Sequence, residues 1–185
     1  VERFVEKAPK NSIVAIPIHG STANIHDMIT QSKGSFNQTK IGIKKLLKAG
    51  IHVELRIVVS RLNKDDIHNI AQMISDELSE VSIMAMEMTG SARVNQDKVW
   101  ISYVDAAQVA EDAALVLIEN GIDVKLYNFP LCTVKKEYWT LCEKSISPDK
   151  VRYAETCENC KMKNACGGVF AGTMSMEKGE LRAII

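Results

Sequence analysis

Five cysteines lie in the C-terminal third of the chain, at Cys132, Cys142, Cys157, Cys160 and Cys166. The last three form a C-x2-C-x5-C run that continues into two glycines. Cysteine thiolates are soft ligands, and in proteins they hold zinc ions and iron–sulfur clusters. The sequence therefore predicts a metal centre in this part of the chain.

The spacing of these cysteines bears on which metal they would bind. Structural zinc prefers four tetrahedral thiolate or imidazole ligands and commonly uses two C-x2-C pairs, whereas this chain has a single C-x2-C pair. The spacing therefore favours a cluster, and zinc remains the open alternative. From residue 129 onward the sequence shows little hydrophobic periodicity. A short segment of this kind usually needs a metal or disulfides to hold its fold.

The overall composition is that of a globular protein of 185 residues, with 46% hydrophobic and 25% charged residues. Lysine plus arginine and aspartate plus glutamate each number 23, so the charge balance predicts no nucleic-acid partner and no binding to an anionic membrane. No apolar run reaches the roughly 18 residues that a membrane span needs, and the N-terminus lacks the pattern of a signal peptide. We expect a cytoplasmic location, where cysteines favour metal or redox chemistry over disulfides.

The elements that must position these residues alternate along the chain. We expect strands over 12–18, 52–59, 81–86 and 123–127, and helices over 37–48, 65–78 and 105–120. Asp105 is expected to cap the last helix, and Gly50 and Gly121 are expected to end two of the helices. Strands that alternate with helices of this length predict an α/β fold, with a parallel sheet and right-handed crossovers.

Polar and turn residues follow each expected strand. They are His19, Gly20, Ser21, Ser60, Arg61, Asn63, Glu87, Thr89, Gly90, Arg93, Asn95 and Asn128. The carboxyl ends of parallel strands meet at one edge of a sheet, and function gathers there. Such a set would suit a zwitterionic ligand with hydroxyl groups, such as a nucleoside amino acid.

Several of these residues also have a structural interpretation. The 19–21 run suits a simple turn, and Asn63 suits a helix N-cap. Arg56 lies inside a strand, where it would pair with a neighbouring carboxylate such as Glu54 or Glu87. The sequence leaves both interpretations open.

Several stretches resemble the radical S-adenosylmethionine (SAM) enzymes. The runs 34–36, 42–43 and 50–59, together with Asn63, look like the middle of the partial (β/α)6 barrel of that superfamily. More narrowly, four runs are similar to the radical SAM maturases of His-Xaa-Ser repeat peptide systems: 86–95, 126–132, 145–147 and 157–170. The resemblance covers nearly the whole chain, and its C-terminal half is the more specific part.

The resemblance implies two units. Residues 1–128 would be the C-terminal part of the barrel, without its N-terminal cluster-binding units, and residues 129–185 would be a Cys-rich extension similar to twitch or SPASM domains. Such extensions bind auxiliary [4Fe-4S] clusters through a C-x2-C-x5-C core. A full SPASM pattern would add a cysteine at the position of Phe170, so the resemblance implies one auxiliary cluster. Its implied ligands are the three cysteines of the core plus Cys132, with Cys142 as the rival fourth ligand.

The resemblance also implies an activity. Radical SAM enzymes hold a catalytic [4Fe-4S] cluster on a C-x3-C-x2-C motif, which this chain lacks. The motif is expected upstream of Val1, so this chain alone is expected to be inactive. The parent enzyme would cleave SAM, and the 5′-deoxyadenosyl radical would abstract hydrogen from a ribosomally made peptide. By analogy, the residues that face SAM would be Ser21, Arg56, Ser60 and Glu87.

The implied partners are a peptide substrate, an electron donor such as a ferredoxin or flavodoxin, and a partner maturase. Two other hypotheses stay open. The first is a non-catalytic β/α module that binds a peptide and carries a structural zinc site. The second is a pseudo-enzyme that never had the catalytic cluster.

Overall fold

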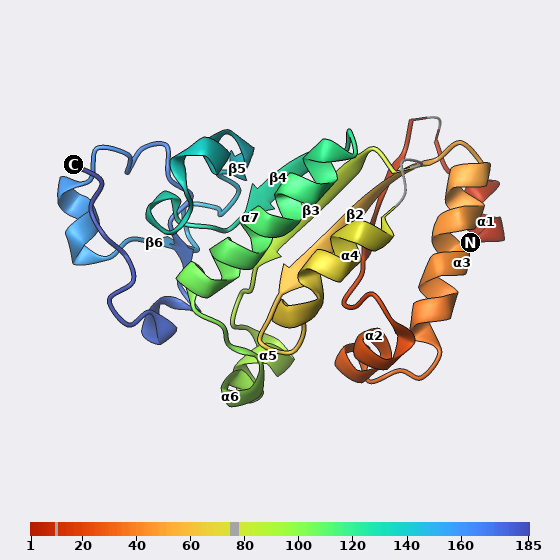
Figure 1. Ribbon diagram of the computed structural model, residues 1–185, viewed down its shortest axis with the longest axis horizontal. Coiled ribbons are helices and arrows are strands. Elements are labelled where there is room, and N and C mark those ends of the chain that lie inside the picture. Colours follow the sequence, from red (N-terminus) through yellow and green to blue (C-terminus); the bar gives the residue numbers. More distant parts are fainter. Residues whose placement is uncertain (10, 75–77) are drawn as a thin grey trace.

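The computed structural model describes residues 1–9, 11–74 and 78–185, and a parallel sheet runs through its centre (Figure 1). Its five strands are adjacent in chain order, and each pair of neighbours is parallel. They are β1 (Ile13–Pro17), β2 (His52–Val59), β3 (Glu80–Ala85), β4 (Asp123–Tyr127) and β5 (Cys142–Glu143). The predicted α/β class with a parallel sheet is confirmed, and β2 and β4 have the predicted bounds.

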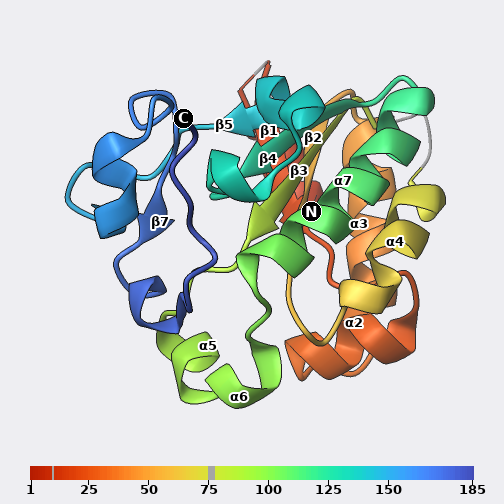
Figure 2. The ribbon, with the colours of Figure 1, turned by 60° about the vertical axis from the view of Figure 1, so that its left-hand side comes forward.

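Helices α3, α4 and α7 lie on the same face of this sheet, as Figures 1 and 2 show from two directions, and α2 packs against α3. Among the described residues, four helices have seven or more residues: α2 (Ala23–Thr30), α3 (Ser35–Lys48), α4 (Ile67–Met73) and α7 (Tyr103–Glu119). The shorter ones are α1 (Glu2–Val5), α5 (Gly90–Val94) and α6 (Gln96–Val99). None of the described helices is both long and apolar enough to cross a membrane.

Period-two alternation in the strands builds the core on the helix-covered face. On β2 the side chains of Val53, Leu55, Ile57 and Val59 are almost fully buried. Val81 and Ile83 on β3, and Val124 and Leu126 on β4, continue this apolar layer. Successive side chains of a strand point to opposite faces, so the residues between them belong to the other face, which no long helix of the described residues covers.

The bounds of all three predicted helices needed correction, and α3 begins at Ser35, two residues before the predicted start. Ser102 caps α7, since its hydroxyl accepts a hydrogen bond from the Asp105 N–H at 3.0 Å. The prediction that Asp105 is the cap was wrong, because Asp105 lies inside the first turn, where its charge favours the helix dipole. The helix expected over 65–78 begins as a short 3-10 turn and its α-helical part ends at Met73, with Ile74 already extended. Residues 75–77 of that prediction lie outside the described residues.

The segment after β4 is built from short elements. They are η2 (Leu131–Thr133), η3 (Lys136–Leu141), β5, β6 (Val151–Arg152), η4 (Glu155–Asn159), β7 (Val169–Phe170) and η5 (Met174–Met176). The label η1 belongs to a 3-10 turn earlier in the chain, Lys64–Asp66. Strands β6 and β7 form a separate antiparallel pair. Because β5 extends the main sheet and Val169 is fully buried in the core, the segment packs against the α/β part rather than standing apart.

Candidate functional site

Four of the five cysteines line one cavity in the C-terminal segment: Cys132, Cys157, Cys160 and Cys166. The cavity has a volume of about 20 Å³. Apolar and neutral neighbours complete much of its wall, among them Pro130, Met162, Leu181 and Ile184. The four residues predicted to be metal ligands therefore line the same cavity.

The four cysteines reach this cavity from separate short turns. Cys132 belongs to η2, just beyond the carboxyl end of β4, and Cys157 belongs to η4. The Cys160 N–H donates to the Cys157 carbonyl at 3.2 Å, which places these two cysteines one tight turn apart. The Cys166 N–H donates to the Met162 carbonyl at 2.9 Å and closes the next turn. The C-x2-C-x5-C spacing is therefore the spacing of two consecutive turns.

Backbone N–H groups point at the sulfur atoms of this cavity. Cys166 Sγ accepts from the N–H groups of Leu131 and Gly168, each at 3.4 Å. Cys160 Sγ accepts from the N–H of Ile184 at 3.3 Å. A neutral thiol is a weak acceptor, and hydrogen bonds to an ionised acceptor are stronger. Donors aimed at sulfur therefore suit thiolates, as in metal–sulfur sites, where such bonds tune the cluster.

Gly168 holds the third cysteine in place through its backbone. Its φ is +65°, and a Cβ added there would lie 2.6 Å from Val151 Cγ2 and 2.8 Å from the Arg152 carbonyl oxygen. The same strand pair is tied down by Tyr153, whose hydroxyl donates to the Cys166 carbonyl at 3.1 Å. Glycine at this position lets the chain turn against β6 and still direct its N–H at Cys166.

Cys132 and Cys142 were rivals for the fourth position, and the structure separates their surroundings. Cys142 lies in β5, paired with the buried residue Leu126, and it does not line the cavity. Its thiol donates to the Tyr138 carbonyl at 3.7 Å, and burial raises its pKa to about 12. Burial also raises the pKa of Cys132, but a hydrogen bond from the backbone of Arg182 acts in the opposite direction.

Two observations on this cavity differ. Four thiols line it, yet within the described ranges no three histidine, cysteine, aspartate or glutamate side chains are placed closely enough to hold a metal ion. Rotation about χ1 moves a cysteine sulfur between staggered positions without moving the backbone. The common lining is therefore the more informative of the two, and the soft four-sulfur donor set fits a zinc ion or an iron–sulfur cluster.

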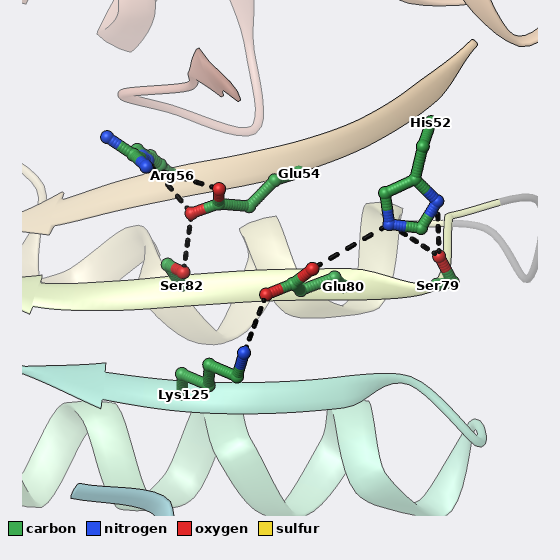
Figure 3. A network of polar contacts seen from close by, with 7 residues as sticks. All are labelled: His52, Glu54, Arg56, Ser79, Glu80, Ser82 and Lys125. Atoms are coloured by element: carbon green, nitrogen blue, oxygen red, sulfur yellow. Dashed lines mark hydrogen bonds and ion pairs between the residues drawn. The ribbon is translucent and has the colours of Figure 1, made fainter. Parts of the chain in front are cut away.

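The uncovered face of the sheet carries a network of charged residues (Figure 3). Glu54 accepts hydrogen bonds from Arg56 Nε at 2.8 Å and from Ser82 Oγ at 2.7 Å. Both bonds lower the pKa of Glu54, and the bond from Arg56 has the larger effect. One strand away, Glu80 pairs with Lys125 Nζ at 3.1 Å. Parallel sheets normally bury both faces under apolar residues, so a charged face on β2, β3 and β4 marks a candidate ligand surface.

The four residues proposed to face SAM have different surroundings. Ser21 donates both its N–H and its hydroxyl to Asp66, each at 2.6 Å. Ser60 is buried and donates its N–H and hydroxyl to Asn63 Oδ1 at 2.8 and 2.9 Å. Both serines are therefore already engaged in the loops after β1 and β2. Glu87 lies half-buried in the loop after β3.

Two structural interpretations from the sequence can now be judged. Arg56 does pair with Glu54, as predicted. Asn63 precedes η1 but its side chain does not cap that turn. It instead donates to the carbonyls of His19 at 3.2 Å and Val58 at 3.0 Å. Asn63 therefore occupies the predicted N-cap position of η1, but it makes no capping hydrogen bond. Its side chain instead joins two strand-end loops that the sequence could not show to be neighbours.

Sequence reasoning missed two parts of the site. One is the Glu80–Lys125 pair, whose signal was present: polar residues alternate with buried apolar ones along β3 and β4. The other is the run 181–184, of which Leu181, Arg182 and Ile184 line the cysteine cavity. The Ile184 N–H that donates to Cys160 Sγ belongs to the backbone and leaves no residue-type signal.

Comparison with known proteins adds no family assignment. No family model matches the chain, and the curated proteins contain no match to it.

Proposed function

We propose that this chain is the C-terminal part of a radical SAM enzyme that modifies a ribosomally made peptide, and that its cysteine cavity holds an auxiliary [4Fe-4S] cluster. The observation that carries the proposal is the common cavity of Cys132, Cys157, Cys160 and Cys166 beside the carboxyl end of β4. Four soft donors in one cavity match the ligand set of such a cluster. The peptide-maturase assignment depends on the resemblance of the C-terminal half.

The sheet topology supports the barrel part of the proposal. Five parallel strands follow one another in chain order, and the helices α3, α4 and α7 between them lie on one face. Doubly wound folds place helices on both faces, whereas (β/α) barrels keep all helices outside and turn the other face inward. A partial barrel would therefore have an inner face like the charged face described here, and this argument is one of fold analogy.

The residues of this chain would have distinct roles at the auxiliary site. The four thiolates would bind the cluster, the N–H groups of Leu131, Gly168 and Ile184 would stabilise the charge on sulfur, and apolar neighbours would exclude water. When bound, the cluster would supply a one-electron redox centre or an iron site for substrate.

On the open face, Arg56 is the strongest of the four residues proposed to contact SAM. Its guanidinium is fixed by Glu54, yet 46% of its side chain remains exposed. An arginine held in this way can offer its remaining N–H groups to a carboxylate. Ser21 and Ser60 would act mainly by shaping their loops, because their donors are already used.

The second candidate function is a peptide-binding module with a structural zinc. The same donor set favours it, since zinc also accepts four thiolates. The two candidates differ in what the purified chain should contain, and in whether removal of the metal would unfold the segment.

The test is metal and sulfide analysis of the chain purified and reconstituted without oxygen. About four irons and four acid-labile sulfides per chain would support the cluster, and Cys157→Ser should lose them. About one zinc without sulfide would overturn the auxiliary cluster and favour the structural site. For the catalytic part, the sequence encoded upstream of Val1 should contain C-x3-C-x2-C, and its absence there would favour a pseudo-enzyme.

A further inference from the structure

The C-terminal run 181–184 lies across the cysteine cavity. The Lys161 N–H donates to the Ile184 carbonyl at 2.9 Å, and the Thr156 hydroxyl donates to the Leu181 carbonyl at 3.4 Å. Leu181, Arg182 and Ile184 all line the cavity. These contacts hold the run against η4 and the turn that follows it, beside the C-terminus in Figure 1.

One N–H group of this run points at sulfur. The Ile184 N–H donates to Cys160 Sγ at 3.3 Å. The preceding residue, Ala183, makes no backbone hydrogen bond through its N–H among the described residues. The run therefore contributes a sulfur-directed donor to one of the four cysteines.

Three cations also line the cavity: Arg152, Lys163 and Arg182. Lys163 Nζ lies 5.6 Å from the centre of the Tyr153 ring. In the part of the chain that the structure describes, none of the three pairs with a carboxylate. An iron–sulfur cluster held by four thiolates is anionic, and positive charge close to it offsets that charge.

We propose that the run 181–184, together with Arg152 and Lys163, sets the reduction potential of the bound cluster and shields it from solvent. The inference depends on the proposed function, since it assumes a cluster in this cavity. Reduction adds negative charge to a cluster, so nearby cations and N–H donors to sulfur stabilise the reduced form and raise the potential. Arg182 contributes a cation, and Ile184 contributes an N–H.

The test uses the full chain with its cluster reconstituted without oxygen. Ile184→Pro removes one sulfur-directed N–H, and Ala183→Pro is the matched control because it removes an N–H without such a bond. Arg182→Gln and Lys163→Gln remove charge and keep the backbone, with Lys48→Gln on α3 as the charge control. For each variant we would measure iron and sulfide content, the midpoint potential by redox titration, and the rate of cluster bleaching in air.

The expected result is a lower midpoint potential in Arg182→Gln, Lys163→Gln and Ile184→Pro, with faster bleaching in Ile184→Pro. Ala183→Pro and Lys48→Gln should match the unchanged chain. Unaltered potentials in the three variants, at full iron content, would overturn the inference and leave the proposed cluster standing. The inference would also be overturned if Ala183→Pro and Ile184→Pro had the same midpoint potential and the same rate of bleaching. No iron in the unchanged chain would overturn the proposed function itself, and the inference with it.

Discussion

The hydroxyl of Tyr103, at the start of α7, lies 2.8 Å from the hydroxyl of Thr173 in the C-terminal segment. Both residues are buried, at 2% and 0% exposure. Thr173 donates its single hydroxyl proton to the Phe170 carbonyl at 2.9 Å, so Tyr103 must be the donor in the pair. This buried contact joins the segment that carries the cysteines to the α/β part of the protein.

Replacement of Tyr103 by phenylalanine should destabilise the protein by about 1 kcal/mol, the usual net contribution of one hydrogen bond. The effect should depend on pH, because burial raises the pKa of Tyr103 to about 12 from an ordinary value of 10.0. The folded state then holds the proton more tightly than the unfolded state, so this stability is present below pH 10 and lost toward pH 12.

Urea unfolding of the unchanged chain and of Tyr103→Phe at pH 8 and at pH 11 would check this expectation. The difference between the two proteins should shrink at the higher pH. Tyr138→Phe, in η3, is the control for loss of a tyrosine hydroxyl elsewhere. A pH-independent difference between the unchanged chain and Tyr103→Phe would contradict the assigned cause.

The parallel sheet was predictable because its strands carry strong local signals. On β2, Val53, Leu55 and Ile57 alternate with polar residues, and this pattern alone indicates a half-buried strand. The end of α4 was harder to predict, since apolar residues at helical spacing continue through Ile74 while the backbone there is already extended. Local periodicity predicts that an element exists better than it predicts where the element ends.

The candidate site was predictable in residue type and only partly in arrangement. The spacing of Cys157, Cys160 and Cys166 indicates a shared site, because short turns keep them close. Nothing in the spacing distinguishes Cys132 from Cys142, whose positions depend on whether the chain turns into η2 or pairs in β5. Tertiary packing determines which of these local structures forms, and a sequence pattern does not indicate tertiary packing.

Glu54→Gln should weaken the charged network on the open face. Glu54 accepts bonds from Arg56 and Ser82, and hydrogen bonds to charged groups contribute up to about 3 kcal/mol. We expect the free energy of unfolding to fall by about 1 kcal/mol, because Arg56 is half exposed and solvent screens the ion pair. The pKa of Glu54 is lowered from 4.5 by its hydrogen bond to Arg56. This stability should therefore be present above pH 4.5 and be lost as the pH falls through the lowered pKa.

Thermal or urea unfolding between pH 3 and pH 7 would measure this loss. The unchanged chain and Glu54→Gln should differ at pH 7 and converge at the acid end. Glu137→Gln, at an exposed position in η3, provides a control for removal of one carboxylate. A constant difference across this range would show that charge on Glu54 is not the cause.

Gly168→Ala should impair metal binding as well as stability. An added Cβ would overlap Val151 and the Arg152 carbonyl, and the backbone there has a positive φ. Gly179→Ala is a matched control, because Gly179 has a φ of +80° with nothing within 4 Å of the added atom. In both variants an alanine at positive φ costs about 1–2 kcal/mol. Only in Gly168→Ala does the added Cβ also overlap neighbouring atoms.

Iron content after reconstitution and the midpoint of urea unfolding would distinguish the two glycine variants. Gly168→Ala should bind less iron and unfold at lower urea than Gly179→Ala. If the two variants behaved alike, the close approach of Gly168 to β6 would have no bearing on the cysteine cavity.

Cys132→Ser should abolish iron binding, whereas Cys142→Ser should keep it. Cys132 lines the cavity with the other three cysteines, and Cys142 lies in β5 with its thiol donated to Tyr138. The pKa of Cys142 is raised to about 12 by burial, so at pH 8 roughly one thiol in ten thousand would be ionised and able to react. Cys142 should therefore resist alkylation by iodoacetamide in the folded chain and react once the chain is unfolded in urea. Peptide mass spectrometry would measure the extent of alkylation in both states. Rapid alkylation of folded Cys142 would contradict its burial, and loss of iron in Cys142→Ser alone would make Cys142 the fourth ligand.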